Sequence, residues 1–296
     1  MNVPEAPYTI PPQEYRLPGE LALGPVRLQV SDLKRSIAYY ERVLGLGVVQ
    51  REGAVATLAA ANDEPRLVEL HELPGAVPVP RRGRLGLYHF ALLLPDRASL
   101  GRFVAHLTAV GERAGSADHL VSEAVYLTDP DGLGIEVYAD RPRSSWRMQG
   151  QALAMATDPL DLDDLVRAGG GQKWAGAPAG TRMGHIHLFV GDLERAAAFY
   201  HRGLGLDRVV LDFPGALFMS AGGYHHHLGT NTWAAGAPLA AEGDARLLQW
   251  SLRLPAHSDV AAASRALAAS GYAVRPEGGD ATVRDPWGTM LRLTAG

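Results

Sequence analysis

Segments in which apolar and polar residues alternate recur along the chain and predict β-strands. In GHIHLFV, residues 184–190, isoleucine, leucine and valine fall on one face, whereas His185, His187 and Phe189 fall on the other. In GLGIEVY, Glu136 lies opposite the isoleucine and the valine in the same way. We therefore expect sheets whose apolar face packs against helices and whose polar face lines a concavity.

The strand and helix pattern occurs twice, at a spacing of 160 residues. A strand followed by a short helix is predicted around Asp32 and again around Asp192. A strand, a proline and a second helix are predicted around Pro95 and again around Pro255. Aspartate is a favoured N-cap residue, and a glycine follows the first helix of each half, as expected at a helix C-terminus. The chain is therefore interpreted as a duplication.

Each half divides again into two modules with the element order βαβββ. The four modules are predicted at residues 22–72, 86–140, 182–233 and 247–296. The first pair of modules gives a domain at 22–140 and the second pair a domain at 182–296, joined by a connector at 141–181 with one short helix. The fold class is predicted to be α+β. Modules two and three form one incomplete β-barrel and modules one and four another, with the helices packed outside.

Composition narrows the possible chemistry. Of the 296 residues, 47% are hydrophobic and 20% are charged, and the formal net charge is -4, so we expect neither a nucleic-acid partner nor a membrane partner. A cytoplasmic protein is the default expectation. The chain has no cysteine, which excludes thiolate ligands, but it has 11 histidines. Any metal site must therefore be built from His, Asp and Glu.

Superposition of the four modules on their shared motifs brings ligand-type side chains into corresponding positions. Modules two and three carry His89, Glu136 and His185 there. The other two modules lack a histidine or carboxylate at the equivalent positions, which are Pro25, Gln249 and Arg292. If modules two and three share one barrel, the three side chains converge on its concave face. Two imidazoles and one carboxylate are the ligand set typical of non-haem Fe(II) with open coordination positions.

Four motifs carry a resemblance to a known family. They are GLYHFALLLPD, DHLVSEAVYLTDPDGLGIEVYADRPRSSW, GHIHLFVGDL and GGYHHHLGTNTW. Through them, residues 22–296 resemble the vicinal-oxygen-chelate superfamily of paired βαβββ modules. Within it, the chain is similar to four-module extradiol ring-cleaving dioxygenases of the catechol 2,3-dioxygenase type.

This resemblance implies a definite activity. Such enzymes bind Fe(II), occasionally Mn(II), through two His and one Glu, and they use O2 to open the ring of a catechol next to the diol. Their assisting Tyr lies ten residues before the Glu ligand, which corresponds to Tyr126, and the assisting His precedes it, which corresponds to His119. The partners implied are a small aromatic diol and O2, and we expect a homo-oligomer, either a dimer or a tetramer.

The resemblance also implies an acid/base histidine on the strand that contains GGYHHHLGTNTW. If alternation holds through that strand, Leu228 faces the helices and His227 faces the site. His227 is therefore the expected acid/base residue, with His225 and His226 left open. An imidazole suits this role because its pKa lies near the operating pH.

Two alternative functions remain open at the level of sequence. If modules one and two pair instead, the cluster becomes Glu69, His89 and Glu136, which is closer to a metal-dependent lyase or isomerase of the glyoxalase type or to a thiol transferase. The second alternative is a metal-free protein that binds an aromatic ligand. Arg141, Arg143 and Trp146, which follow the Glu136 strand, are interpreted as part of the connector rather than as a cover over the site.

Overall fold

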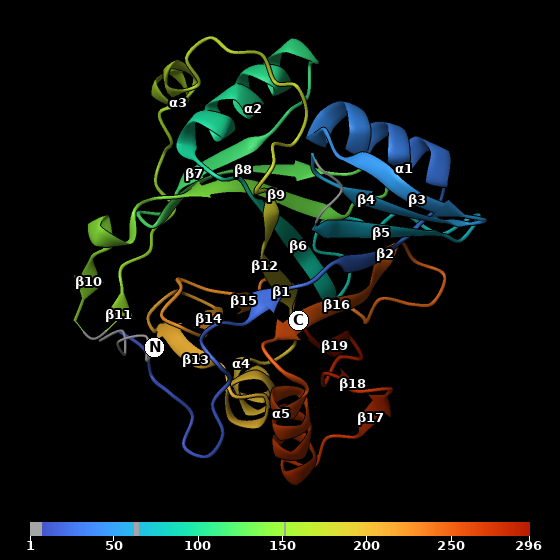
Figure 1. Ribbon diagram of the computed structural model, residues 1–296, viewed down its shortest axis with the longest axis vertical. Helices are drawn as coiled ribbons and strands as arrows, with labels where there is room; N and C mark the ends of the chain where they lie inside the picture. Colours follow the sequence, from blue (N-terminus) through green and yellow to red (C-terminus); the bar gives the residue numbers. More distant parts are fainter. Residues whose placement is uncertain (1–7, 62–64, 151) are drawn as a thin grey trace.

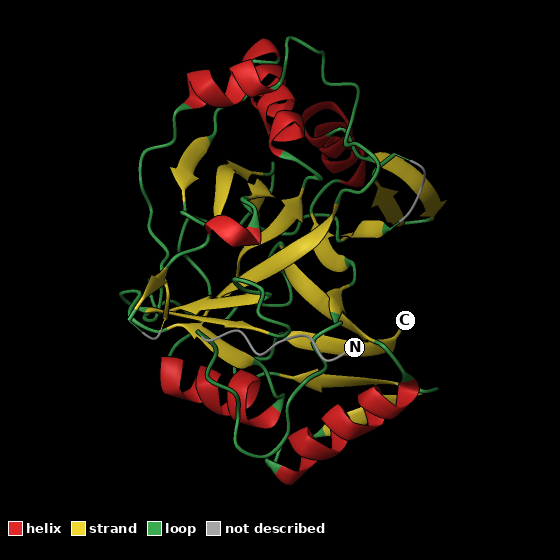
Figure 2. Cartoon of the chain, turned by 60° about the vertical axis from the view of Figure 1, so that its left-hand side comes forward, coloured by secondary structure: helices red, strands yellow, loops and turns green. Residues whose placement is uncertain are grey.

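The computed structural model describes residues 8–61, 65–150 and 152–296. Four βαβββ modules occupy this part of the chain, with the strands gathered in the middle of the molecule and helices above and below them (Figures 1 and 2). No helix among the described residues is both long and apolar enough to cross a membrane.

The modules share the same order of elements. Module one contains β2 (Val26–Val30), α1 (Leu33–Tyr39) with a π-helical continuation η1 (Tyr40–Leu44), β3 (Gly47–Glu52), β4 (Val55–Ala59) and β5 (Arg66–Glu72). Module two contains β6 (Gly86–Leu93), α2 (Arg97–Ala109), β7 (Gly115–Asp118), β8 (Ser122–Thr128) and β9 (Gly134–Asp140). Module three contains β12 (Arg182–Phe189), α4 (Leu193–Ala196) with η3 (Ala197–Gly203), β13 (Asp207–Val210), β14 (Ala216–Ser220) and β15 (Leu228–Asn231). Module four contains β16 (Arg246–Leu254), α5 (His257–Ala269), β17 (Val274–Glu277), β18 (Asp280–Arg284) and β19 (Met290–Ala295).

The strands form two large curved sheets, each built from one module of either half. One sheet has the order β13-β14-β15-β12-β6-β9-β8-β7, so modules three and two meet where β12 pairs with β6. The other has the order β17-β18-β19-β16-β2-β5-β4-β3, joined where β16 pairs with β2, and β1 (Ala22–Leu23) adds to β16. The predicted fold class and the pairing of modules two and three are confirmed. The alternative pairing of modules one and two is wrong.

The helix ends follow the predicted capping chemistry. The Asp32 carboxylate accepts a hydrogen bond from the backbone N–H of Arg35 at 2.9 Å, and Asp192 does the same with Arg195 at 2.7 Å. Gly45 ends the first helix with a φ of 70°, and a Cβ there would lie 2.6 Å from the Cα of Gly176. Only glycine combines that backbone conformation with that approach of the connector.

The helices of each half lie together, although the strands are shared between the halves. In Figure 1, α1 and α2 lie above the sheets, whereas α4 and α5 lie below them. Tyr40 at the end of α1 donates to the buried carboxylate of Asp129 in the turn before β9, at 3.2 Å. Tyr200 donates in the same way to Asp285 in the turn before β19, at 2.8 Å. Each bond therefore ties one large sheet to the other.

The connector between the halves contains more structure than expected. Besides the expected short helix, α3 (Leu162–Ala168), it forms a 3-10 turn, η2 (Arg143–Ser145), and a small hairpin of β10 (Met148–Gln149) with β11 (Ala152–Leu153). The first part of the connector reaches the polar face of the sheet that contains β6 and β12, as the contacts of Trp146 and Ala156 described below show.

Candidate metal centre

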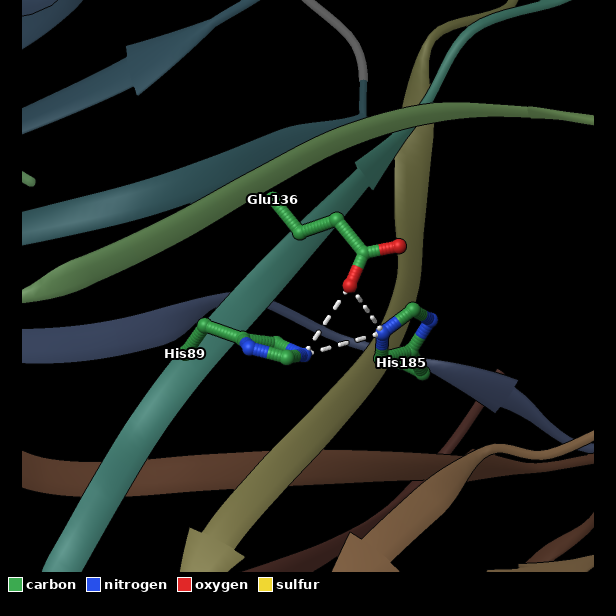
Figure 3. A group of neighbouring side chains, drawn as sticks. All are labelled: His89, Glu136 and His185. Carbon is green, nitrogen blue, oxygen red and sulfur yellow. Dashed lines mark hydrogen bonds and ion pairs between the residues drawn. The ribbon is translucent and has the colours of Figure 1, made fainter. Parts of the chain in front are cut away.

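His89, Glu136 and His185 converge on the concave face of the sheet shared by modules two and three. Each comes from a different strand, β6, β9 and β12 respectively (Figure 3). Their exposed fractions are 4%, 2% and 2%. Nε2 of His89 lies 3.3 Å from Nε2 of His185, and Oε2 of Glu136 lies 3.0 Å and 3.1 Å from these two atoms. The structure thus gathers three ligand-type atoms around one point.

The size of this triangle fits a divalent metal ion. Metal bonds of about 2.1 Å to three neighbouring corners of an octahedron place the ligand atoms about 3.0 Å apart. The observed edges of 3.0–3.3 Å agree with this arrangement. The donor set of two imidazoles and one carboxylate leaves the opposite three corners for other ligands. These residues could therefore hold a metal ion.

Burial and mutual contact set the protonation states that such an ion requires. Burial alone raises the pKa of Glu136, but the adjacent rings of His185 and His89 lower that pKa well below its ordinary value. Burial lowers the pKa of His89 below its ordinary value, because a charged imidazole is poorly solvated there. An ionised carboxylate and a neutral imidazole are the forms that coordinate metals.

Aromatic packing, rather than hydrogen bonding, orients the two imidazoles. The Nδ1 atoms of His89 and His185 are buried and have no hydrogen-bond partner in the described part of the chain. The Tyr88 ring packs against His89 with the centroids 4.6 Å apart, and the Tyr138 ring packs against His185 at 4.9 Å. Ring contacts on β6 and β9 therefore fix the direction in which each Nε2 points.

His119 and Tyr126 lie together beside this triad. Tyr126 is the cross-strand neighbour of Glu136, and its ring centroid lies 5.7 Å from that of His89. Nδ1 of His119 lies 2.6 Å from the carbonyl oxygen of Ala156 in the connector. A carbonyl oxygen only accepts, so Nδ1 carries the proton, and Nε2 accepts from the Tyr126 hydroxyl at 2.5 Å. The sequence provides no pattern that points to Ala156.

The three consecutive histidines adopt an arrangement that the alternation argument does not describe. Strand β15 begins at Leu228, so residues 225–227 precede it and do not alternate. His226 packs its ring on His185 at a centroid distance of 4.1 Å. His225 is turned toward Asp140, with Nε2 and Oδ1 2.9 Å apart. His227 is turned toward the Ser220 end of β14, where its Nδ1 accepts the backbone N–H of residue 221 at 3.3 Å.

Another buried histidine, His187, lies next to the triad. Its centroid lies 5.0 Å from that of His89, and its Nε2 accepts a hydrogen bond from the Asn231 side-chain amide at 2.9 Å. Gly229 leaves room for this ring, because a Cβ at that position would lie 2.8 Å from Nδ1. Aromatic side chains surround it, namely Tyr88, Phe218 and Trp233. The alternation of GHIHLFV already places His187 on the face of His185, but nothing in the sequence points to Asn231.

The equivalent face of the other sheet carries two ion pairs. Where the first sheet has His187 opposite Gly229, this one has Arg27 opposite Glu69, with Nε and Oε1 3.0 Å apart. Arg292, at the position of Glu136, pairs with Asp280 at 2.9 Å. Glu69 and His89 lie in different sheets, so the alternative cluster of Glu69, His89 and Glu136 does not form.

Comparisons with known proteins agree with the family that the sequence motifs resemble. A family model described as the Glyoxalase/Bleomycin resistance protein/Dioxygenase superfamily matches residues 22–137 and 182–293. A protein from Bacillus subtilis (strain 168) named catechol-2,3-dioxygenase is 41% identical over 268 residues, which are 89% of this chain and 93% of the relative.

Two solved structures share the fold at low sequence identity. A putative dioxygenase from Bacillus subtilis subsp. subtilis str. 168 is 15% identical, with 95% of this chain and 86% of that chain covered and a TM-score of 0.67. Glyoxalase I from Zea mays is 18% identical, with 93% and 92% covered and a TM-score of 0.57. At such identities the likeness concerns the fold alone.

Proposed function

This chain belongs to the glyoxalase/bleomycin resistance protein/dioxygenase superfamily, and from this premise we propose that it is an Fe(II)-dependent extradiol dioxygenase. Its substrate is catechol or a substituted catechol, and both atoms of O2 enter the product as the ring bond next to the diol breaks. The observation that carries the proposal is the buried triangle of His89, Glu136 and His185. The relative that is 41% identical and named catechol-2,3-dioxygenase supports the reaction and the substrate class.

The metal proposed is Fe(II), with Mn(II) as the second choice. When bound by the three residues, it would supply open positions for the two oxygens of the diol and for O2, and a path for electrons from the diol to oxygen. The protein contributes the carboxylate that offsets part of the ion's charge and the dry surroundings of the site. Proton transfer and orientation of the substrate are assigned to neighbouring side chains.

The proton of the diol needs an acceptor beside the metal ligands. We assign this role to His226 rather than to the expected His227, because the His226 ring packs on His185 while His227 is turned toward β14. An imidazole can take a proton from the substrate hydroxyl and return it to the product as the ring opens. The His227 ring instead packs against Tyr224 and accepts a hydrogen bond at the end of β14.

Tyr126 and His119 are assigned an orienting role. The Ala156 carbonyl fixes the proton of His119 on Nδ1, so His119 Nε2 holds the Tyr126 O–H. The lone pairs of the Tyr126 oxygen are then free to accept a hydrogen bond from a substrate next to His89. This pair therefore orients a hydroxyl group without itself losing a proton.

The alternative functions receive less support. A lyase or isomerase of the glyoxalase type predicts a fourth protein ligand, whereas the cluster in the described part of the chain has three. A metal-free binding protein leaves unexplained why a carboxylate is buried between two imidazoles, at a considerable desolvation cost. A cytoplasmic location and a homo-oligomeric state stay predictions.

The test is anaerobic reconstitution of the purified protein with Fe(II), followed by a panel of catechols in oxygenated buffer. We expect a yellow ring-opened product and one O2 consumed per product formed. His89→Ala is the control and is expected to lose both iron and activity. Failure of the whole panel with iron verified in the protein contradicts the proposal, and turnover without oxygen uptake favours the lyase or isomerase.

A further inference from the structure

Two hydrogen bonds connect the end of β9 to His226, which lies beside the proposed metal centre. Asp140, the last residue of β9, is partly exposed, with 25% of its side chain accessible. Its Oδ1 lies 2.9 Å from Nε2 of His225, and Nδ1 of His225 lies 2.8 Å from Nδ1 of His226. His226 in turn packs on His185. The exposed fractions of His225 and His226 are 0% and 5%, so solvent has little access to the two rings.

The carboxylate at one end, together with a neutral His225, determines where the protons of these three residues lie. An ionised carboxylate only accepts hydrogen bonds, so Nε2 of His225 must carry a proton. In neutral His225, Nδ1 is then the acceptor, and the proton between the two rings belongs to Nδ1 of His226. A neutral His226 with its proton on Nδ1 has an unprotonated Nε2. That nitrogen makes no hydrogen bond to the described residues.

Side chains around His225 fix the ring in place. Tyr224 packs on it at a centroid distance of 4.1 Å, and Trp146 of the connector packs on it at 5.4 Å. The Arg143 guanidinium lies 5.5 Å from the Trp146 ring and 5.8 Å from the Tyr224 ring. The Tyr224 hydroxyl donates to the same Asp140 oxygen at 3.1 Å. Arg143 and Trp146 therefore cover the hydrogen-bonded residues next to the site. This corrects the interpretation that they belong only to the connector.

We propose that Asp140 and His225 are positioning residues that hold His226 with its proton on Nδ1, so that Nε2 is available as an acceptor at the site. The proposal rests on the proposed function, since His226 matters only if a substrate proton has to be moved. The proton passes from the substrate hydroxyl to Nε2 of His226 and later from Nε2 to the product. The Nδ1 proton stays between the two rings throughout. His225 and Asp140 stabilise the transient imidazolium, as the carboxylate does in a Ser-His-Asp triad.

The direct test reads the tautomer without turnover. Full-length protein labelled with ¹⁵N-histidine and loaded with diamagnetic Zn(II) is studied by long-range ¹H–¹⁵N correlation, with the His226 signals assigned from the His226→Gln variant. We expect the proton of His226 on Nδ1 in the unmodified protein. A proton on Nε2 instead, or on both nitrogens, overturns the proposal even if every substitution below impairs folding.

Substitutions then test what sets this tautomer. Asp140→Ala removes the acceptor, so a second His226 population with Nε2 protonated is expected to appear. With Fe(II), the same variant is expected to lose about 10- to 100-fold in kcat. Its KM and its iron content are expected to stay within about twofold of the unmodified protein, because no metal ligand has changed. An unchanged His226 tautomer in Asp140→Ala overturns the proposal.

Two further variants separate positioning from general disruption. Asp140→Glu keeps a carboxylate and is expected to restore the Nδ1 tautomer and most of kcat. Tyr224→Phe removes the other hydrogen bond to Oδ1 of Asp140 but keeps the ring, and is expected to retain the tautomer. Loss of the tautomer in Tyr224→Phe contradicts the assignment to the Asp140–His225 bond. If His226 of the unmodified protein carries its proton on Nδ1 but the protein does not cleave catechols, the proposed function is contradicted and the positioning proposal is not.

Discussion

At the scale of single residues, regular secondary structure decided what could be predicted. His89, Glu136 and His185 lie in strands, where alternation and the repeat register determine which way a side chain points. The run at 225–227 lies before β15, where no such period applies, so the choice of His227 had no structural basis. The contacts of Asp140 with His225 join segments 85 residues apart, which a single sequence does not indicate.

A matched pair of substitutions tests the choice among these histidines. His226→Gln is expected to lower kcat of the Fe(II) enzyme by about 100-fold or more, because the proton acceptor beside the metal ligands is lost. His227→Gln, which makes the same chemical change one residue away, is expected to leave kcat within a few-fold. Steady-state kinetics with iron content measured for each variant checks this. A larger loss for His227→Gln would return the assignment to His227.

At the scale of elements, each half connects its two modules by a buried tyrosine–aspartate hydrogen bond, but the side chains next to that bond differ. The helix-end tyrosines Tyr40 and Tyr200 each donate to a buried aspartate in the turn of the following module. Next to the Tyr40–Asp129 hydrogen bond, Arg35 forms an ion pair with the buried Asp131. At the equivalent place, Arg195 lies over the Trp287 ring, 5.5 Å from its centroid. Nothing in the sequence analysis indicated that the Asp129 carboxylate joins two modules.

The buried carboxyl group of Asp129 predicts a specific pH dependence of the free energy of unfolding. Burial raises the pKa of Asp129 to about 7, although the backbone N–H groups of Leu133 and Asp131 act in the opposite direction. The unfolded chain keeps the ordinary value of about 3.9, so the folded state binds this proton more tightly. The contribution to stability is fully present below about pH 4 and is lost as the pH rises to about 7.

Asp129→Asn removes this titration. We expect its free energy of unfolding to rise, relative to that of the unmodified protein, by about 1–4 kcal/mol as the pH goes from 4 to 7, because only the unmodified protein loses the stabilising proton. Urea unfolding at a series of pH values measures this difference. Asp163→Asn, which makes the same change at an exposed position of α3, is the control and is expected to show no such trend. A flat difference for Asp129→Asn contradicts the expected titration.

At the scale of the molecule, each sheet and the proposed metal centre depend on both halves of the chain. β6 pairs with β12 and β2 pairs with β16, and His89 and Glu136 come from the first half while His185 comes from the second. The distribution of candidate ligands over modules two and three favoured this exchange, although the pairing of modules one and two stayed open at the level of sequence. It could not predict the part played by the connector, because residues 146 and 156 contact the site through a ring and a backbone carbonyl.

Separation of the halves tests this dependence. The chain can be divided before Gly180, in an exposed turn of the connector, into residues 1–179 and 180–296. Neither piece alone is expected to bind Fe(II) or Zn(II) tightly, because each lacks part of the triad and an edge partner for its sheets. Co-expression is expected to yield a complex that binds one metal ion. Tight, stoichiometric binding by the first piece alone would contradict a site built from both halves.

The location of the metal itself tests the central claim most directly. Crystals of the Fe(II)-loaded protein, grown without oxygen, can be measured on both sides of the iron absorption edge to locate iron by its anomalous scattering. We predict one peak per chain, about 2.0–2.3 Å from Nε2 of His89, Nε2 of His185 and a carboxylate oxygen of Glu136. A peak bound elsewhere, or fully loaded protein with no peak between these three side chains, would contradict the account.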